Sequence, residues 1–154
     1  MAKKDFRILI AISERAFAEK VLKELRKTYT VHLAKDLKEF SAKVHKLDLD
    51  LVVIDYRFSG VKAEDIYHGI EVLHPNAVFV IYAEKDRRDL AVRLWKRRAF
   101  DYIVHTRDVY SFIEEINKCV RWAIQKAQVE SLRKKMDALA ETVRELSRKI
   151  QRTL

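Results

Sequence analysis

The stretch Asp50-Leu51-Val52-Val53-Ile54-Asp55-Tyr56-Arg57-Phe58-Ser59-Gly60 decides the fold of this chain. Its apolar run, residues 51–54, can bury side chains on both faces of a sheet, as central parallel strands do. The run ends on a carboxylate, Asp55, and Gly60 marks the loop that follows. The segment therefore predicts a buried strand that presents Asp55 at its carboxyl end.

Similar short apolar runs alternate with segments of helical spacing along the rest of the chain. Strands are expected over residues 6–12, 28–33, 50–55, 77–82 and 100–104, and helices over 14–27, 36–47, 63–73, 85–98 and from 108 onward. This alternation predicts a doubly wound α/β fold with a five-stranded parallel sheet. Such sheets bind ligands at the carboxyl ends of their strands, where Ser13, Asp55, Tyr82 and His105 are expected to meet.

The last helix carries a heptad seam that continues beyond the globular part. Its apolar residues are Val129, Leu132, Met136, Leu139, Val143, Leu146 and Ile150. Mostly β-branched residues at a and leucine at d favour a parallel two-stranded coiled coil. The alternative is that the seam packs on its own domain. We expect a globular domain over residues 1–127 and a homodimeric coiled coil over 128–154.

Composition limits the function classes. No apolar segment of the 154 residues is long enough to cross a membrane, and the N-terminus lacks the features of a signal peptide. The single cysteine, Cys119, excludes an internal disulfide, and no Cys/His spacing suits zinc. A cytoplasmic protein is expected. The high share of charged residues, 36%, leans toward a thermophilic source. The net charge of +9 favours association with a negatively charged partner, without identifying its class.

Three blocks in order resemble the receiver domain of two-component response regulators: residues 8–11, 50–60 and 99–104. The resemblance covers about residues 6–127. It implies the CheY-like (flavodoxin-like) strand order 2-1-3-4-5, a place in phosphorelay signal transduction, and Asp55 as the phosphoacceptor position. A last helix that continues into a dimeric coiled coil is similar to receivers of the nitrogen-regulator type. No output domain follows here, which indicates a stand-alone unit or the front of a longer regulator.

The chain departs from the receiver pattern around Asp55. The acidic pair that holds Mg²⁺ in the family falls on Ile12 and Ser13, with Glu14 next, and an aliphatic side chain offers no oxygen ligand. The family's small hydroxyl falls on Tyr82 and its lysine on His105. Phosphoryl transfer depends on positioning and on neutralising charge, so these replacements predict very slow transfer.

The sequence therefore predicts a non-enzymatic, degenerate pseudo-receiver without a cofactor, in which Asp55 caps the loop or pairs with Arg57 or His105. The alternative is a phosphorylatable regulator in which Glu14 restores a Mg²⁺ site. The basic end of the helix expected over residues 85–98 is a candidate docking face for an unknown protein partner. It consists of Arg93, Trp95, Lys96, Arg97 and Arg98. Nucleic acid is a third, less favoured ligand, because no DNA-reading motif accompanies these cations.

Overall fold

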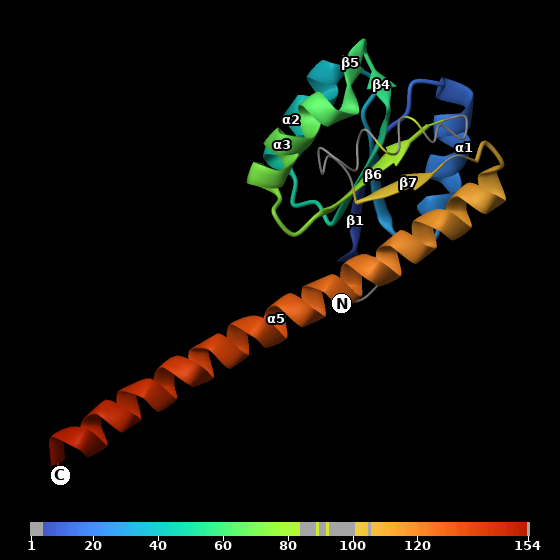
Figure 1. The fold of residues 1–154 in the computed structure, drawn as a ribbon. Coiled ribbons are helices and arrows are strands. Elements are labelled where there is room, and N and C mark those ends of the chain that lie inside the picture. The colour runs from blue at the N-terminus through green and yellow to red at the C-terminus, as the bar shows by residue number, and fades with distance from the viewer. Residues whose placement is uncertain (1–4, 84–88, 90–91, 93–100, 105, 154) are drawn as a thin grey trace. The chain divides into compact units, whose positions relative to one another are not determined.

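The computed structural model describes residues 5–83, 89, 92, 101–104 and 106–153 (Figure 1). The chain divides into two compact units, Met1–Ala123 and Ile124–Leu154. The expected boundary, after residue 127, lies slightly later in the chain and stays a prediction.

A parallel sheet forms the centre of the first unit. Its strands are β1 (Arg7–Ala11), β2 (Thr30–Leu33), β3 (Leu51–Asp55), β6 (Val78–Tyr82) and β7 (Tyr102–Val104). They lie in the order β2-β1-β3-β6-β7, and every neighbouring pair is parallel. The predicted α/β class and the parallel sheet are confirmed. The central strand β3 is buried along Leu51–Ile54, as its uninterrupted apolar run requires.

Three helices connect strands in the described part of the chain, and a fourth follows the last strand. They are α1 (Arg15–Leu25), α2 (Leu37–Lys46), α3 (Ala63–Leu73) and α5 (Val109–Thr153). The Asp36 side chain caps α2 by accepting a hydrogen bond of 2.8 Å from the Glu39 N–H. The helix expected over residues 85–98 lies outside the described residues, apart from Asp89 and Val92, which are helical.

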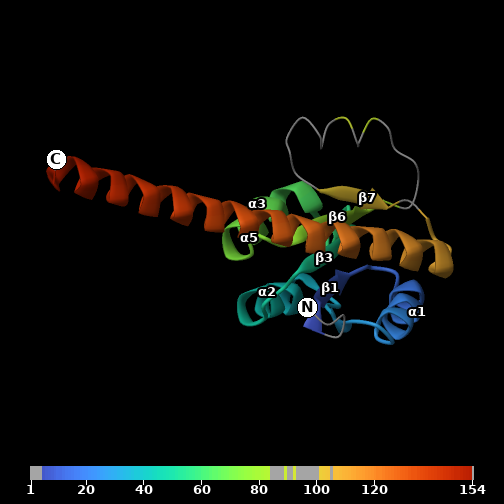
Figure 2. The same cartoon turned by 90° about the horizontal axis from the view of Figure 1, so that it is seen from below.

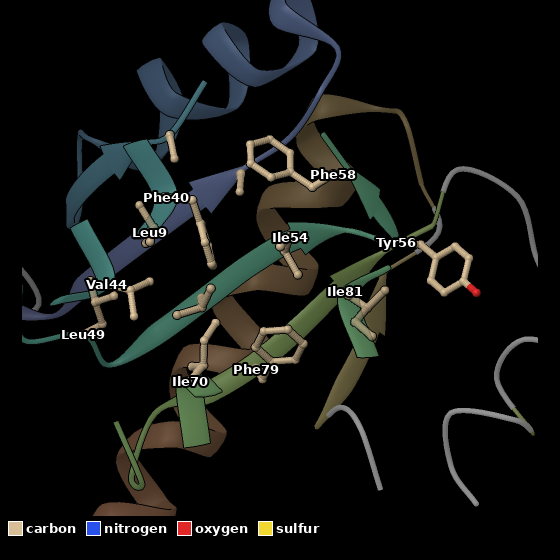
Figure 3. Packing of buried hydrophobic residues seen from close by; sticks show 14 of the residues in the cluster. Leu9, Phe40, Val44, Leu49, Ile54, Tyr56, Phe58, Ile70, Phe79 and Ile81 are labelled. Carbon is tan, nitrogen blue, oxygen red and sulfur yellow. The ribbon is translucent and has the colours of Figure 1, made fainter. Parts of the chain in front are cut away.

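One face of the sheet packs against α2 and α3 (Figure 3). Side chains that point to this face alternate along the strands, as in Val52 and Ile54 of β3, and meet Phe40 of α2 and Ile70 of α3. These side chains are almost completely buried. Every second side chain of a strand points to this face, and the apolar side chains of α2 and α3 recur at helical spacing on the side that covers it. A shift of one residue in a strand would turn its apolar side chains away from these helices, so the packing fixes the strand register.

The opposite face of the sheet packs against α1 and the first turns of α5, so helices cover both faces (Figure 2). Phe17 of α1, Tyr82 of β6 and Phe112 of α5 form a cluster of three rings, with centroids 5.3–5.5 Å apart. The Tyr29 hydroxyl, just before β2, donates to Asn117 Oδ1 of α5 at 2.5 Å. These contacts hold the start of α5 to the sheet.

The segment after Asp55, expected to be a loop, contains a small hairpin instead. Strand β4 (Arg57–Phe58) pairs antiparallel with β5 (Val61–Lys62). The turn between them uses left-handed backbone at Ser59 and Gly60, with φ of 51° and 78°. Strands of two residues are too short to show a period in the sequence, and burial of Phe58 against Phe40 holds this hairpin in place.

The second unit is helical throughout its described residues. Within the described part of the chain, no helix is both long enough and apolar enough to span a membrane.

Candidate functional site

The candidate site lies at the carboxyl edge of the sheet, around Asp55. Asp55 is partly buried at the end of β3, and its backbone pairs in register with Tyr82 of β6. The backbone N–H of Ser13, just past the end of β1, donates a hydrogen bond to Asp55 Oδ2. The structure thus brings together Ser13, Asp55 and Tyr82. His105 lies outside the described residues.

Ile12 and Ser13 occupy the positions where the receiver resemblance places an acidic pair. The Ile12 side chain is buried, with 3% of its surface exposed, and it has no polar atom. Ser13 contributes a backbone N–H, which donates a hydrogen bond to the Asp55 carboxylate. This donor set does not suit Mg²⁺, which requires oxygen ligands in a near-octahedral arrangement.

Glu14, the alternative magnesium ligand, forms an ion pair with Arg107. Arg107 follows β7, so the pair links the β1–α1 loop to the β7–α5 loop. Both side chains are about half exposed, at 49% and 51%. A carboxylate that already binds a guanidinium is a poor candidate for rescuing a metal site. Among the described residues, no group of three or more His, Cys, Asp or Glu side chains lies close enough to bind a metal ion.

Sequence reasoning missed Arg107, because its partner is distant in the sequence and the two meet only through the order of the strands. Its neighbour Asp108 directly precedes α5 and accepts hydrogen bonds from the N–H and the hydroxyl of Ser111, at 3.0 and 2.8 Å. These bonds lower the pKa of Asp108. The side chain of Asp108 thus caps the start of α5.

Tyr82 replaces the small hydroxyl residue of the receiver pattern with a packed aromatic ring. Register partners in a parallel sheet direct their side chains to the same face, so Tyr82 and Asp55 share a face. The Tyr82 ring is only 5% exposed and stacks on Phe17 at 5.4 Å, with Phe112 at 5.5 Å. The ring is therefore part of the core beside Asp55.

A buried carboxylate near the site also escaped the sequence analysis. Glu64, in the first turn of α3, is only 4% exposed, and its Oε1 accepts a hydrogen bond of 3.3 Å from the Tyr56 hydroxyl. Charged residues are seldom buried, so only the tertiary contact reveals it. The Arg57 guanidinium lies over the Tyr56 ring, 5.8 Å from its centroid.

The seven seam residues lie on helix α5, in the second unit. Each is 53–69% exposed: Val129, Leu132, Met136, Leu139, Val143, Leu146 and Ile150. Ion pairs between Arg133 and Glu130 and between Arg144 and Glu141, at 2.7 and 3.0 Å, lie beside the seam on the same helix. The single chain thus leaves the seam exposed.

The expected docking face lies outside the described residues. It comprises Arg93, Trp95, Lys96, Arg97 and Arg98. Its role therefore stays a prediction from the sequence.

No protein-family model matches the chain, and no curated protein matches it. The solved structures that match are mostly CheY-like response-regulator receiver domains. The chain has the receiver fold. At these low identities the likeness concerns the fold alone, which agrees with the parallel sheet and the strand order described above.

Three matches show the range of proteins with this fold. A CheY-like receiver domain from Methanospirillum hungatei has 16% identity and a TM-score of 0.68, with 79% of this chain and 98% of that chain covered. An adenylate cyclase from Rhodopirellula baltica has 13% identity and a TM-score of 0.70, with 86% of this chain and 96% of that chain covered. A streptococcal redox sensor that evolved from two-component response regulators has 17% identity and a TM-score of 0.69, with 80% of this chain and 55% of that chain covered.

Proposed function

We propose that this protein is a non-catalytic signalling regulator, an atypical receiver that acts by dimerisation and protein binding without phosphorylation of Asp55. It works in the cytoplasm as a parallel coiled-coil homodimer. This proposal includes the five-stranded CheY-like arrangement and the coiled coil expected from the sequence.

The observation that carries the proposal is the set of contacts around Asp55. Among the described residues, Asp55 and Glu14 each have a partner in the chain: Asp55 accepts the Ser13 N–H, and Glu14 pairs with Arg107. Buried Ile12 stands where an oxygen ligand would be needed. Phosphoryl transfer needs positive charge on the developing phosphoryl oxygens, and loss of one such contact typically costs about 3–4 kcal/mol of transition-state stabilisation.

Known proteins of this fold support a role outside phosphotransfer. One matching structure is of a redox-sensor family that evolved from two-component response regulators. The same fold has therefore been put to a different signalling use in that family. In the present chain, the retained Asp55 is then a structural hydrogen-bond acceptor that joins β3 to the β1–α1 loop.

The direct test is incubation with Mg²⁺ and beryllofluoride or acetyl phosphate. We expect no mass increase with acetyl phosphate and no change in amide resonances with beryllofluoride. The matched control is Asp55→Asn, which should give the same result as the wild type. A stoichiometric adduct that disappears in Asp55→Asn would establish the alternative, a phosphorylatable regulator.

A further inference from the structure

A hollow lies at the carboxyl edge of the sheet, between the β1–α1 and β2–α2 loops. It has a volume of about 190 Å³. Ile12, Ser13, Arg15, Ala18, Leu33, Ala34 and Lys35 line it, and all of them are described residues. The carboxyl ends of parallel strands are the usual place for ligands in open α/β sheets.

The hollow has an apolar floor and a cationic rim. Ile12, Ala18 and Ala34 are at most 3% exposed and form the floor. Arg15 and Lys35 are exposed at the rim, one from each side of the hollow. Small-molecule sites typically combine an apolar lining with a few polar groups that orient the ligand.

The acidic groups near Arg15 and Lys35 already have partners among the described residues. Glu14 pairs with Arg107, and Asp36 accepts the Glu39 N–H at 2.8 Å. The Glu39 carboxylate accepts the Lys35 backbone N–H, also at 2.8 Å. In the described part of the chain, neither the Arg15 guanidinium nor the Lys35 ammonium forms an ion pair with an acidic side chain.

We propose that this hollow binds a small phosphate monoester, with the phosphate between Arg15 and Lys35 and the organic group on the apolar floor. Two cations match the charge of a dianionic phosphate, and an arginine can bind two of its oxygens at once. Ser13 also lines the hollow, and its side chain carries a hydroxyl that can donate a further hydrogen bond. The small volume limits the organic group to a few carbon atoms. This binding is independent of the function proposed above.

The test is a titration of the full chain with butyl phosphate and with inorganic phosphate, followed by amide resonances. We expect saturable shifts centred on Ser13, Ala34 and Lys35. Butyl phosphate should bind about fivefold or more tightly than inorganic phosphate, because its chain covers the apolar floor. Arg15→Gln/Lys35→Gln should weaken binding about tenfold or more, since charge-assisted hydrogen bonds are lost.

The matched control is Arg148→Gln/Lys149→Gln, which removes the same charge from the second unit and should bind butyl phosphate like the wild type. Equal weakening in both double variants would show non-specific attraction by net charge and overturn the proposal. Shifts that do not saturate, or equal affinity for the two phosphates, would overturn it as well.

Discussion

Asp55 lies at the strand end where the receiver pattern places it, but the side chains around it differ from that pattern. Its strand is intact and its register with Tyr82 is that of a parallel sheet. The Ser13 N–H donates a hydrogen bond to one oxygen of Asp55. Glu14, the residue after Ser13, forms an ion pair with the Arg107 guanidinium. The chemistry of an aspartate depends on the charges around it, and the Asp55 carboxylate here joins β3 to the β1–α1 loop through the Ser13 N–H.

Cys119 gives a test of burial at the residue scale. Burial raises the pKa of its thiol to about 12, and the charges of Glu115 and Asp101 add to the rise. Since the thiolate is the reactive form, Ellman's reagent at neutral pH should modify the folded chain more than about a hundredfold more slowly than the unfolded chain. Ser131→Cys, which adds an exposed thiol, is the control and should react quickly. Rapid modification of native Cys119 would contradict this.

His32 predicts a pH dependence of stability. Burial lowers its pKa from the ordinary 6.5, and the charges of Lys43, Arg26 and Arg7 lower it further. Below pH 6.5 the unfolded chain therefore binds a proton that the folded chain resists, so the free energy of unfolding should decrease as the pH falls through this range. Urea unfolding of His32→Gln should show a shallower decrease than the wild type. Identical slopes for the two proteins would contradict the assignment.

At the scale of elements, the edge strand β2 is protected by two cations. The outward carbonyls of Val31 and Leu33 accept hydrogen bonds from Arg26 Nε, at 3.3 Å, and from Lys43 Nζ. An open edge with unpaired backbone groups can pair with another chain, and charged side chains are a common protection.

Removal of these cations should expose the edge. We expect Arg26→Met/Lys43→Met to aggregate at a lower temperature than the wild type, as measured by light scattering during heating, with increased thioflavin binding. Lys20→Met/Lys23→Met removes the same charge from α1 and is the control. If both variants aggregate alike, net charge and not the edge governs solubility.

At the scale of the whole molecule, the exposed seam on α5 is the strongest reason to expect a dimer. Seven apolar side chains at heptad spacing stay more than half exposed in one chain. Isolated exposed apolar residues are ordinary, but a continuous stripe of this length marks an interaction site. Association of two such helices would bury the stripe.

Leu139→Lys tests this dimer, since Leu139 lies at the middle d position. Two buried leucines are lost per dimer, which should weaken association by about 3 kcal/mol or more, over a hundredfold. Sedimentation equilibrium should show a wild-type dimer and a monomeric variant at micromolar concentration. Lys134→Ala, on the opposite side of the helix, should remain dimeric. A monomeric wild-type protein would refute the coiled coil.

The sequence by itself determined the features that arise from local patterns. The alternation of apolar runs and helical segments predicted the parallel sheet, because the periods of strands and helices are set by backbone geometry. The cap that Asp36 provides for α2 is local in the same way, since its hydrogen bond spans only three residues. The heptad seam is equally a property of the linear chain.

The tertiary structure alone decided the contacts at the candidate site. Glu14 meets Arg107, and the Ser13 N–H meets Asp55, only after the strand order brings separate loops together. The burial of Glu64 and the ring packing of Tyr82 likewise depend on neighbours from other elements. No local periodicity encodes such long-range contacts, so the fold was readable from the sequence, whereas the surroundings of Asp55 were not.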